Sequence, residues 1–249
     1  METKRLILYG VDGVMGRMVE KEVEKDPRYK LLYGVSPLGN VAGNRILKTL
    51  KGLEEDADLL IDFSHPGNLG DILDYAIRKG VPTLIATTGY DEDGLERIRK
   101  AGEQIPVLLA SNTSFGISLL KTILSSISGQ LEGSFDLEIV EKHHNKKLDA
   151  PSGTAKSLFE AATSGFGEAV DKLHGRGPES GKRQPNQVAI HSIRGGTYPG
   201  EHTVIFAGED EIIEFKHTAL SKRIFATGAL TAGMKLCGKK PGLYSMEEL

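Results

Sequence analysis

The stretch that decides the fold is RLILYGVDGVMGRMVEKEV, residues 5–23. Its apolar start, residues 5–9, predicts a buried β-strand, and its amphipathic end predicts a helix. Glycines between a strand and a helix allow a tight turn, a close approach of the backbone to a pyrophosphate and close packing of the helix. The helix N-terminus adds amide donors for the anion. The turn therefore predicts a dinucleotide site, with contacts at Gly10, Val11, Asp12, Gly13, Val14 and Met15.

The end of the second predicted strand bears on which dinucleotide is bound. A carboxylate for the adenosine ribose is expected there, about 20 residues after the glycine turn. Ser36 and Pro37 stand at this place instead. The missing acid weakens the exclusion of a 2′-phosphate, and the missing arginine weakens its recognition. The sequence therefore leaves NADH and NADPH both open, with Ser36 as a candidate contact.

The glycine spacing is G-x-x-G-x-x-G, not the commoner G-x-G-x-x-G, so the units that follow matter. Apolar runs recur at residues 31–35, 59–63, 83–87 and 107–110, with amphipathic stretches between them. This alternation predicts an α/β fold with a Rossmann-like, doubly wound parallel sheet. Ligands bind at the carboxyl edge of such sheets. We therefore expect cofactor contacts at Ala86, Thr87, Thr88, Ala110, Ser111, Asn112 and Thr113.

The second half of the chain has a different pattern. Residues 117–127 have helical apolar spacing, and residues 135–139 alternate apolar with acidic, as in a strand with one solvated face. Strand-like runs at 188–193, 202–207 and 212–217 lack helices between them. We expect a second α+β domain with a mostly antiparallel or mixed sheet, in which residues 165–186 form a long mobile connection.

We expect two domains. Residues 1–113, completed by a C-terminal helical segment at 222–249, form the dinucleotide-binding domain. Residues 114–221 form the substrate-binding and oligomerisation domain. The net charge of −3 and the ordinary composition give no sign of a nucleic-acid partner. No apolar run has the length of a signal peptide or a membrane span, and Cys237 is the single cysteine. A cytoplasmic protein is expected.

The richest chemistry lies in EIVEKHHNKKLDAPSGTA, residues 138–155. His143, His144 and Lys147 can donate protons near neutral pH and neutralise a dianion. Helix formation near Thr154 would give the Ser-Gly-Thr turn a helix N-terminus that binds a carboxylate. A solvated basic loop and a simple helix cap are the plain alternatives. No recurring ligand spacing surrounds the histidines, so no metal site is expected. Arg194 and His202 are interpreted as half-buried strand residues.

Residues 138–155 resemble, position for position, the E-[IV]-x-E-x-H-x3-K-x-D-x-P-S-G-T-A pattern of the 4-hydroxy-tetrahydrodipicolinate reductases. The resemblance extends to the glycine turn and to residues 61–63, 87–89, 111–112, 200–203 and 225–228. It implies that His143 is the proton donor or acceptor and Lys147 the second donor. It implies that the substrate is bound by His144, Gly153 and Thr154, and the Ser-Gly-Thr turn adds Ser152 as a candidate contact.

By the same resemblance, the reaction would be the NADH- or NADPH-dependent reduction of a cyclic hydroxy-dicarboxylate, in lysine and diaminopimelate biosynthesis, by a homotetramer. Two departures stand out. Ser36 and Pro37 replace charged residues found in some relatives, and Thr113 replaces an aromatic residue. A different two-domain dehydrogenase would not account for the histidine and Ser-Gly-Thr elements. A dinucleotide-sensing regulator would need no proton donors and would add a partner-binding module.

Overall fold

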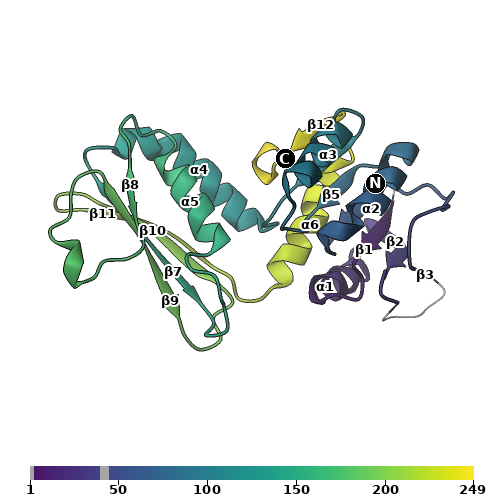
Figure 1. Ribbon diagram of the computed structural model, residues 1–249, viewed down its shortest axis with the longest axis horizontal. Helices are drawn as coiled ribbons and strands as arrows, with labels where there is room; N and C mark the ends of the chain where they lie inside the picture. Colours follow the sequence, from purple (N-terminus) through teal and green to yellow (C-terminus); the bar gives the residue numbers. More distant parts are fainter. Residues whose placement is uncertain (1–2, 40–44) are drawn as a thin grey trace. The chain divides into compact units, whose positions relative to one another are not determined.

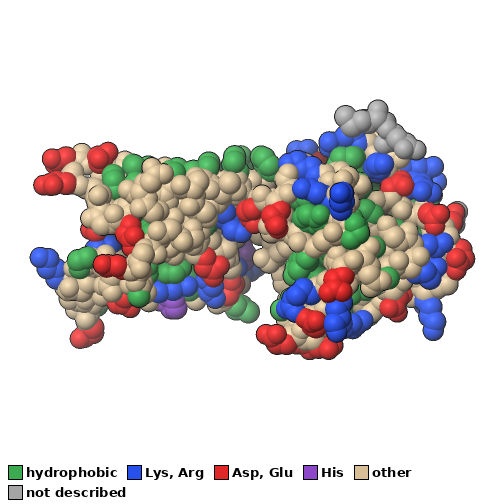
Figure 2. All heavy atoms as spheres, turned by 90° about the horizontal axis from the view of Figure 1, so that it is seen from above, with side chains coloured by type: hydrophobic (Ala, Val, Ile, Leu, Met, Phe, Trp, Pro, Cys, Tyr) green, Lys and Arg blue, Asp and Glu red, His purple; other side chains and the backbone are tan. Residues whose placement is uncertain are grey.

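The structure is a computed structural model that describes residues 3–39 and 45–249. The chain divides into two compact units, Met1–Phe115 with Arg223–Leu249, and Gly116–Lys222. Each unit contains one β-sheet (Figure 1). In Figure 2, acidic and basic side chains are interspersed over the visible face of the first unit, on the right of the view.

The first unit is built on a parallel sheet in the strand order β12-β6-β5-β4-β1-β2-β3. Its strands are β1 (Lys4–Tyr9), β2 (Tyr29–Val35), β3 (Ile46–Leu47), β4 (Leu59–Asp62), β5 (Thr83–Ile85), β6 (Pro106–Leu109) and β12 (Gly242–Tyr244). The order reverses between β1 and β4, which is where doubly wound sheets bind ligands. The predicted Rossmann-like fold is confirmed. Strands β3 and β12 were not predicted, because two or three residues are too short to show a period.

Helices cover both faces of this sheet: α1 (Val14–Val23), α2 (Leu69–Lys79), α3 (Glu92–Gly102) and α6 (Arg223–Leu236), with short 3-10 turns η1 (Pro66–Asn68) and η3 (Met246–Glu248). Successive side chains of β1 point to opposite faces. Leu6 and Leu8 pack in one buried cluster with α1 and α6, whereas Ile7 and Tyr9 pack in another with α2. Because both faces are buried, the strands are continuously apolar.

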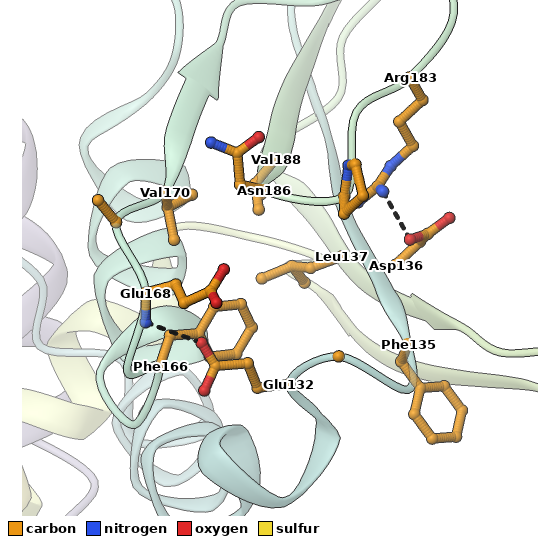
Figure 3. Close-up of a pocket in the computed structure, with 13 residues that line it drawn as sticks. Glu132, Phe135, Asp136, Leu137, Phe166, Glu168, Val170, Arg183, Asn186 and Val188 are labelled. Carbon is orange, nitrogen blue, oxygen red and sulfur yellow. Dashed lines mark hydrogen bonds and ion pairs between the residues drawn. The ribbon is translucent and has the colours of Figure 1, made fainter.

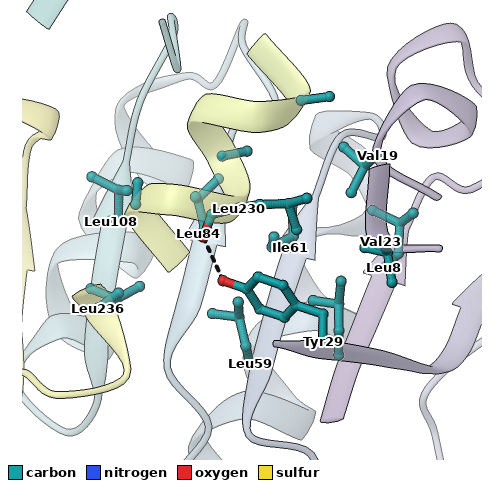
Figure 4. Close-up of a cluster of buried hydrophobic side chains, with 14 of the residues drawn as sticks. Leu8, Val19, Val23, Tyr29, Leu59, Ile61, Leu84, Leu108, Leu230 and Leu236 are labelled. Atoms are coloured by element: carbon teal, nitrogen blue, oxygen red, sulfur yellow. Dashed lines mark hydrogen bonds between the residues drawn. The ribbon is translucent and has the colours of Figure 1, made fainter. Parts of the chain in front are cut away.

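Helix α6 returns to the first unit from the end of the chain. Figure 4 shows Leu230 and Leu236 beside strand residues of the buried cluster, and the Tyr29 hydroxyl donating to the carbonyl of Leu230. Gly228 has no room for a side chain, because an added Cβ would overlap the carbonyl of Thr113. A chain segment more than 200 residues from β1 thus completes the core of the first unit.

The second unit has a mixed sheet in the order β11-β10-β7-β9-β8. Its strands are β7 (Asp136–His143), β8 (Asp171–Leu173), β9 (Gln187–Arg194), β10 (Glu201–Ala207) and β11 (Ile212–Thr218). The pairs β11–β10 and β10–β7 are antiparallel, and the pairs β7–β9 and β8–β9 are parallel. Parallel pairing needs a long crossover, and α5 (Gly153–Thr163) lies in the one between β7 and β9. Helices α4 (Phe115–Leu131) and α5 cover one face of the sheet (Figure 1).

The segment 165–186 is more structured than the predicted connection. It contains β8, which pairs with β9, and the 3-10 turn η2 (Pro178–Ser180). A cavity of about 260 Å³ lies where this segment meets the start of β7. In Figure 3, Arg183 pairs with Asp136, 2.5 Å apart, and Glu132 accepts from the backbone of Glu168. None of the predicted site residues lines this cavity.

Candidate active site

Two glycines of the turn after β1 stand where a side chain would not fit. Gly10 has φ +83°, and a Cβ added there would lie 2.5 Å from the carbonyl oxygen of Phe63. A Cβ on Gly16 would overlap the carbonyl of Gly10. Helix α1 begins at Val14 with Gly13 as its N-cap, and no side chain caps it. The turn therefore packs tightly against the loop after β4 and leaves amide donors at the helix N-terminus for an anion.

Two of the predicted cofactor stretches line one open cavity of about 540 Å³ in the first unit. Its walls are Val14, Met15, Phe63, Ser64, His65, Pro66, Ala86, Thr87, Thr88 and Gly89. The Thr87 hydroxyl accepts from the backbone N–H of Ser64 at 2.8 Å, which ties the loop after β5 to the loop after β4. His65 was not among the predicted cofactor contacts. Its position shortly after β4, at the ligand-binding edge of the sheet, was the signal that it lines the cavity.

The remaining predicted cofactor residues have other partners. Ser36 is fully buried, and its hydroxyl donates to a carboxylate oxygen of Asp12 at 2.8 Å. The Thr113 hydroxyl donates to the carbonyl of Phe225 at 2.7 Å, within the same unit. Asn112 accepts from the backbone N–H of Ser114. Ala110 is buried, and Ser111 is exposed. Together, the glycine turn after β1, the uncapped start of α1 and the open cavity fit a nicotinamide dinucleotide.

In the second unit, Glu141 lies at the centre of a buried network at the end of β7. Its carboxylate has no solvent exposure and lies 2.6 Å from Nδ1 of His143. Both terminal nitrogens of Arg194, from β9, donate to it at 2.8 and 2.7 Å. Burial alone would raise the pKa of Glu141, but the hydrogen bonds from His143 and Arg194 outweigh it and hold that pKa well below its usual range. Glu141 is therefore an anion.

His143 and His202 are neighbours with different environments. Their rings meet edge to face with centroids 5.2 Å apart. His202 is 4% exposed, and its Nε2 shares a hydrogen bond of 3.0 Å with the Ser152 hydroxyl. Burial, with the nearby charge of His143, lowers the pKa of His202 to about 4. His202 is therefore neutral at pH 7, which leaves His143 as the imidazole that can act as the acid.

The Nε2 side of His143 is closely approached by backbone. A Cβ added at Gly200 would lie 3.1 Å from this nitrogen, and Gly200 has φ +154°. Since Glu141 occupies Nδ1, Nε2 is the ring nitrogen left for chemistry. Sequence reasoning gave Arg194 and His202 no part in the site. Their partners lie about 50 residues away in the sequence, so no local pattern could reveal the contacts.

The predicted substrate residues surround the start of α5. Ser152 caps α5, with its hydroxyl accepting from the N–H of Ala155 at 3.1 Å, and its own N–H donates to Glu141. This hydroxyl is buried, so Ser152 holds the helix and His202 in place. Gly153 is exposed at the first turn, beside the partly buried Thr154. The helix start thus presents backbone donors where an anion can reach them.

Two further predicted residues lie on the loop between β7 and α5. Lys147 Nζ pairs with Asp149 at 2.7 Å, and its side chain is 23% exposed. His144 is half-buried, and its N–H donates to the carbonyl of Tyr198. The loop therefore carries two groups that can hold a dicarboxylate.

Within residues 3–39 and 45–249, no cluster of three or more potential metal ligands is found. No described helix has the length and apolar character of a membrane span.

Comparisons with known proteins cover nearly the whole chain. Residues 4–113 match the family described as "Dihydrodipicolinate reductase, N-terminus", and residues 116–249 match "Dihydrodipicolinate reductase, C-terminus". The 4-hydroxy-tetrahydrodipicolinate reductase of Caldanaerobacter subterraneus is 41% identical over 245 residues, covering 98% of this chain and 97% of the relative. That of Exiguobacterium sibiricum is 48% identical over 201 residues, 81% of this chain and 80% of the relative.

Solved structures agree on the fold. A dipicolinate-bound dihydrodipicolinate reductase from a Paenisporosarcina species superposes with a TM-score of 0.81 at 21% identity, covering 98% of this chain and 97% of that one. A scyllo-inositol dehydrogenase from Lactobacillus casei gives a TM-score of 0.59 at 12% identity, covering 94% and 88%. The family matches include the second unit, with its histidine and Ser-Gly-Thr elements. The chain belongs to the 4-hydroxy-tetrahydrodipicolinate reductase family and is a nicotinamide-dependent oxidoreductase.

Proposed function

We propose that this chain reduces 4-hydroxy-tetrahydrodipicolinate to tetrahydrodipicolinate, with loss of water, in lysine and diaminopimelate biosynthesis. The reductant is NADH or NADPH. The observation that carries the proposal is the buried Glu141–His143 pair beside the start of α5. This arrangement supports a proton donor at His143 beside a helix N-terminus suited to a carboxylate, as a small dicarboxylate substrate requires.

The two units have separate roles in this proposal. The first unit binds the cofactor at the glycine turn and at the loops that follow β5 and β6. The reduced nicotinamide, when bound, supplies the hydride. The second unit binds the substrate, with one carboxylate at the N–H groups of Gly153 and Thr154. His144 and Lys147 offset the charge of the dianion.

The proton step falls to His143. Reduction of the conjugated imine adds a hydride and a proton, and water leaves earlier. His143 donates from Nε2, because Glu141 holds Nδ1. Lys147 is the second proton donor and acts in the earlier loss of water, where it protonates the leaving hydroxyl while the neighbouring ring carbon loses a proton to solvent. Glu141 holds the ring of His143 through Nδ1 and so fixes its orientation, as the buried carboxylate of a catalytic triad does.

The direct test is an oxidation assay with purified protein. The unstable substrate is generated in the cuvette from pyruvate and aspartate semialdehyde by a dihydrodipicolinate synthase, and the absorbance of NADH or NADPH is followed. The expected result is oxidation that needs every component. Cofactor binding without oxidation of either nucleotide would overturn the proposal.

Assembly and location remain predictions. The sheet face opposite α4 and α5 includes Ile193 and Ile212, which are 44% and 66% exposed. Apolar side chains on an open sheet favour pairing between copies, so a homotetramer is expected, and light scattering on a sizing column would measure it. The expected location is the cytoplasm, which a fluorescent fusion in the source cell would test.

A further inference from the structure

A carboxylate lies at the place where the second strand of the first unit lacks one. Ser36 directly follows β2, the position from which dinucleotide-binding sheets usually present an acid to the adenosine ribose. Ser36 cannot itself face a ligand, because it is fully buried. Its hydroxyl instead donates to Asp12 Oδ2 at 2.8 Å. The acid at the end of β2 therefore comes from the glycine turn.

The position of Asp12 is set by backbone as well as by Ser36. The N–H groups of Gly10 and Val11 both donate to the carbonyl of Val35, at 2.9 and 3.2 Å, so the turn lies against the end of β2. Asp12 is partly exposed. A carboxylate can accept about four hydrogen bonds, so it can hold ribose hydroxyls while Ser36 holds it.

The charges around this position favour a ribose without a phosphate. Residues 10–16 of the turn include no lysine or arginine, and Val14 opens α1 with a 64% exposed apolar side chain. Two basic residues lie close by. The Arg17 Nε donates to the Asp12 carbonyl at 3.0 Å, and the exposed Lys48 lies beside the backbone of Gly39. A phosphate on a ribose held by Asp12 would lie beside its carboxylate, whose negative charge opposes it.

We propose that Asp12, held by Ser36, binds the adenosine ribose and makes this chain prefer NADH to NADPH. The inference rests on the proposed function only in taking a nicotinamide dinucleotide as the cofactor. Like charges at about 4 Å near a protein surface repel by one to a few kcal/mol, which corresponds to roughly tenfold or more in affinity.

The test is the dissociation constant of each nucleotide for the full-length protein without substrate, measured by titration calorimetry. Wild type is expected to bind NADH at least about tenfold more tightly than NADPH. Asp12→Asn keeps an acceptor for Ser36 and removes the charge, so NADPH binding should improve and the preference should fall by about tenfold. Ser36→Ala keeps the charge but frees the side chain, so the preference should fall by less.

The control is Glu24→Gln. Glu24 is an exposed residue at the far end of α1, and this change alters the net charge equally while leaving the preference as in wild type. The binding of 2′,5′-ADP is also compared with that of AMP, because these two nucleotides differ at the adenosine ribose and lack the nicotinamide end. Equal or tighter NADPH binding by wild type would overturn the inference, as would an unchanged preference in Asp12→Asn. Loss of NADPH binding in Lys48→Ala or Arg17→Ala would also overturn the inference. Binding of neither nucleotide would instead remove the proposed function itself.

Discussion

Glu141 Oε2 lies 2.6 Å from Nδ1 of His143, two residues further along the same strand. Side chains two apart on a strand share one face of the sheet, so β7 presents the carboxylate and the imidazole together. Arg194, on the neighbouring strand β9, forms an ion pair with the same carboxylate. This contact occupies Nδ1 of His143 and leaves Nε2 as the ring nitrogen that the proposed reaction would use.

His143→Gln should lower kcat by about 10² to 10⁴ with a much smaller change in KM, because the substitution removes the proton donor. Glutamine still offers hydrogen bonds of similar reach. Steady-state kinetics with the coupled substrate assay measures both constants. A kcat within a few-fold of wild type would assign the proton to another residue.

Glu141→Gln should lower the free energy of unfolding by about 3 kcal/mol, since the partly buried Arg194 loses the fully buried carboxylate with which it pairs. Turnover should fall as well. The double variant Glu141→Gln with Arg194→Gln removes that unpaired charge and should regain much of the stability, but not the turnover. Urea unfolding and kinetics on both variants separate the two effects. Recovery of turnover in the double variant would mean that Glu141 acts only on stability.

Lys147→Met should lower kcat/KM at least tenfold, through loss of a proton donor and of a charge that binds the dianion. The matched control is Lys146→Met at the neighbouring, exposed position, where a single surface charge should change kcat/KM by no more than about twofold. Equal losses in the two variants would point to the net charge of the loop and not to the position of Lys147.

His202 should make stability depend on pH. Its pKa is lowered by burial to about 4 in the folded protein, below the ordinary 6.5, so the unfolded chain binds the proton more readily. The contribution of neutral His202 is therefore fully present above about pH 6.5 and is lost as pH falls towards 4, by roughly 3 kcal/mol in total. In His202→Gln, the free energy of unfolding should change less with pH between pH 7.5 and pH 5 than in wild type. Urea unfolding at several pH values measures it, since differences of ~1 kcal/mol are resolvable. An unchanged slope would contradict this assignment.

Gly10→Ala and Gly80→Ala should differ in cost. Both glycines have positive φ, +83° and +67°, where an alanine costs about 1–2 kcal/mol. Only Gly10 also faces a contact, at 2.5 Å from the Phe63 carbonyl, whereas nothing lies within 4 Å of a Cβ at Gly80. Gly10→Ala should therefore be less stable by a further ~1–3 kcal/mol and should weaken nucleotide binding. Thermal unfolding compares the pair, and equal melting temperatures would refute the contact.

The sequence by itself determined the parallel sheet of the first unit, and it predicted which residues of the second unit could carry chemistry. The period of the apolar residues, the glycine spacing and the helix-capping residues are local properties of the sequence. Residues 5–23 and 138–155 could therefore be interpreted from their own sequence. The mixed sheet was less predictable. A helix between β7 and β9 makes their pairing parallel, and β8 has only three residues, too few for a period.

Only the tertiary structure decided which distant residues complete each site. Arg194 reaches Glu141 across 53 positions of the chain, His202 reaches Ser152 across 50, and Asp12 meets Ser36 across 24. The first and third contacts arise because neighbouring strands bring their ends to one edge of a sheet, and the second arises because the start of α5 lies beside β10. Strand order and register depend on the packing of the whole unit, which no local pattern records. The sequence therefore predicted the candidate reacting groups, and the fold determined their partners and placed the Asp12 carboxylate next to Ser36.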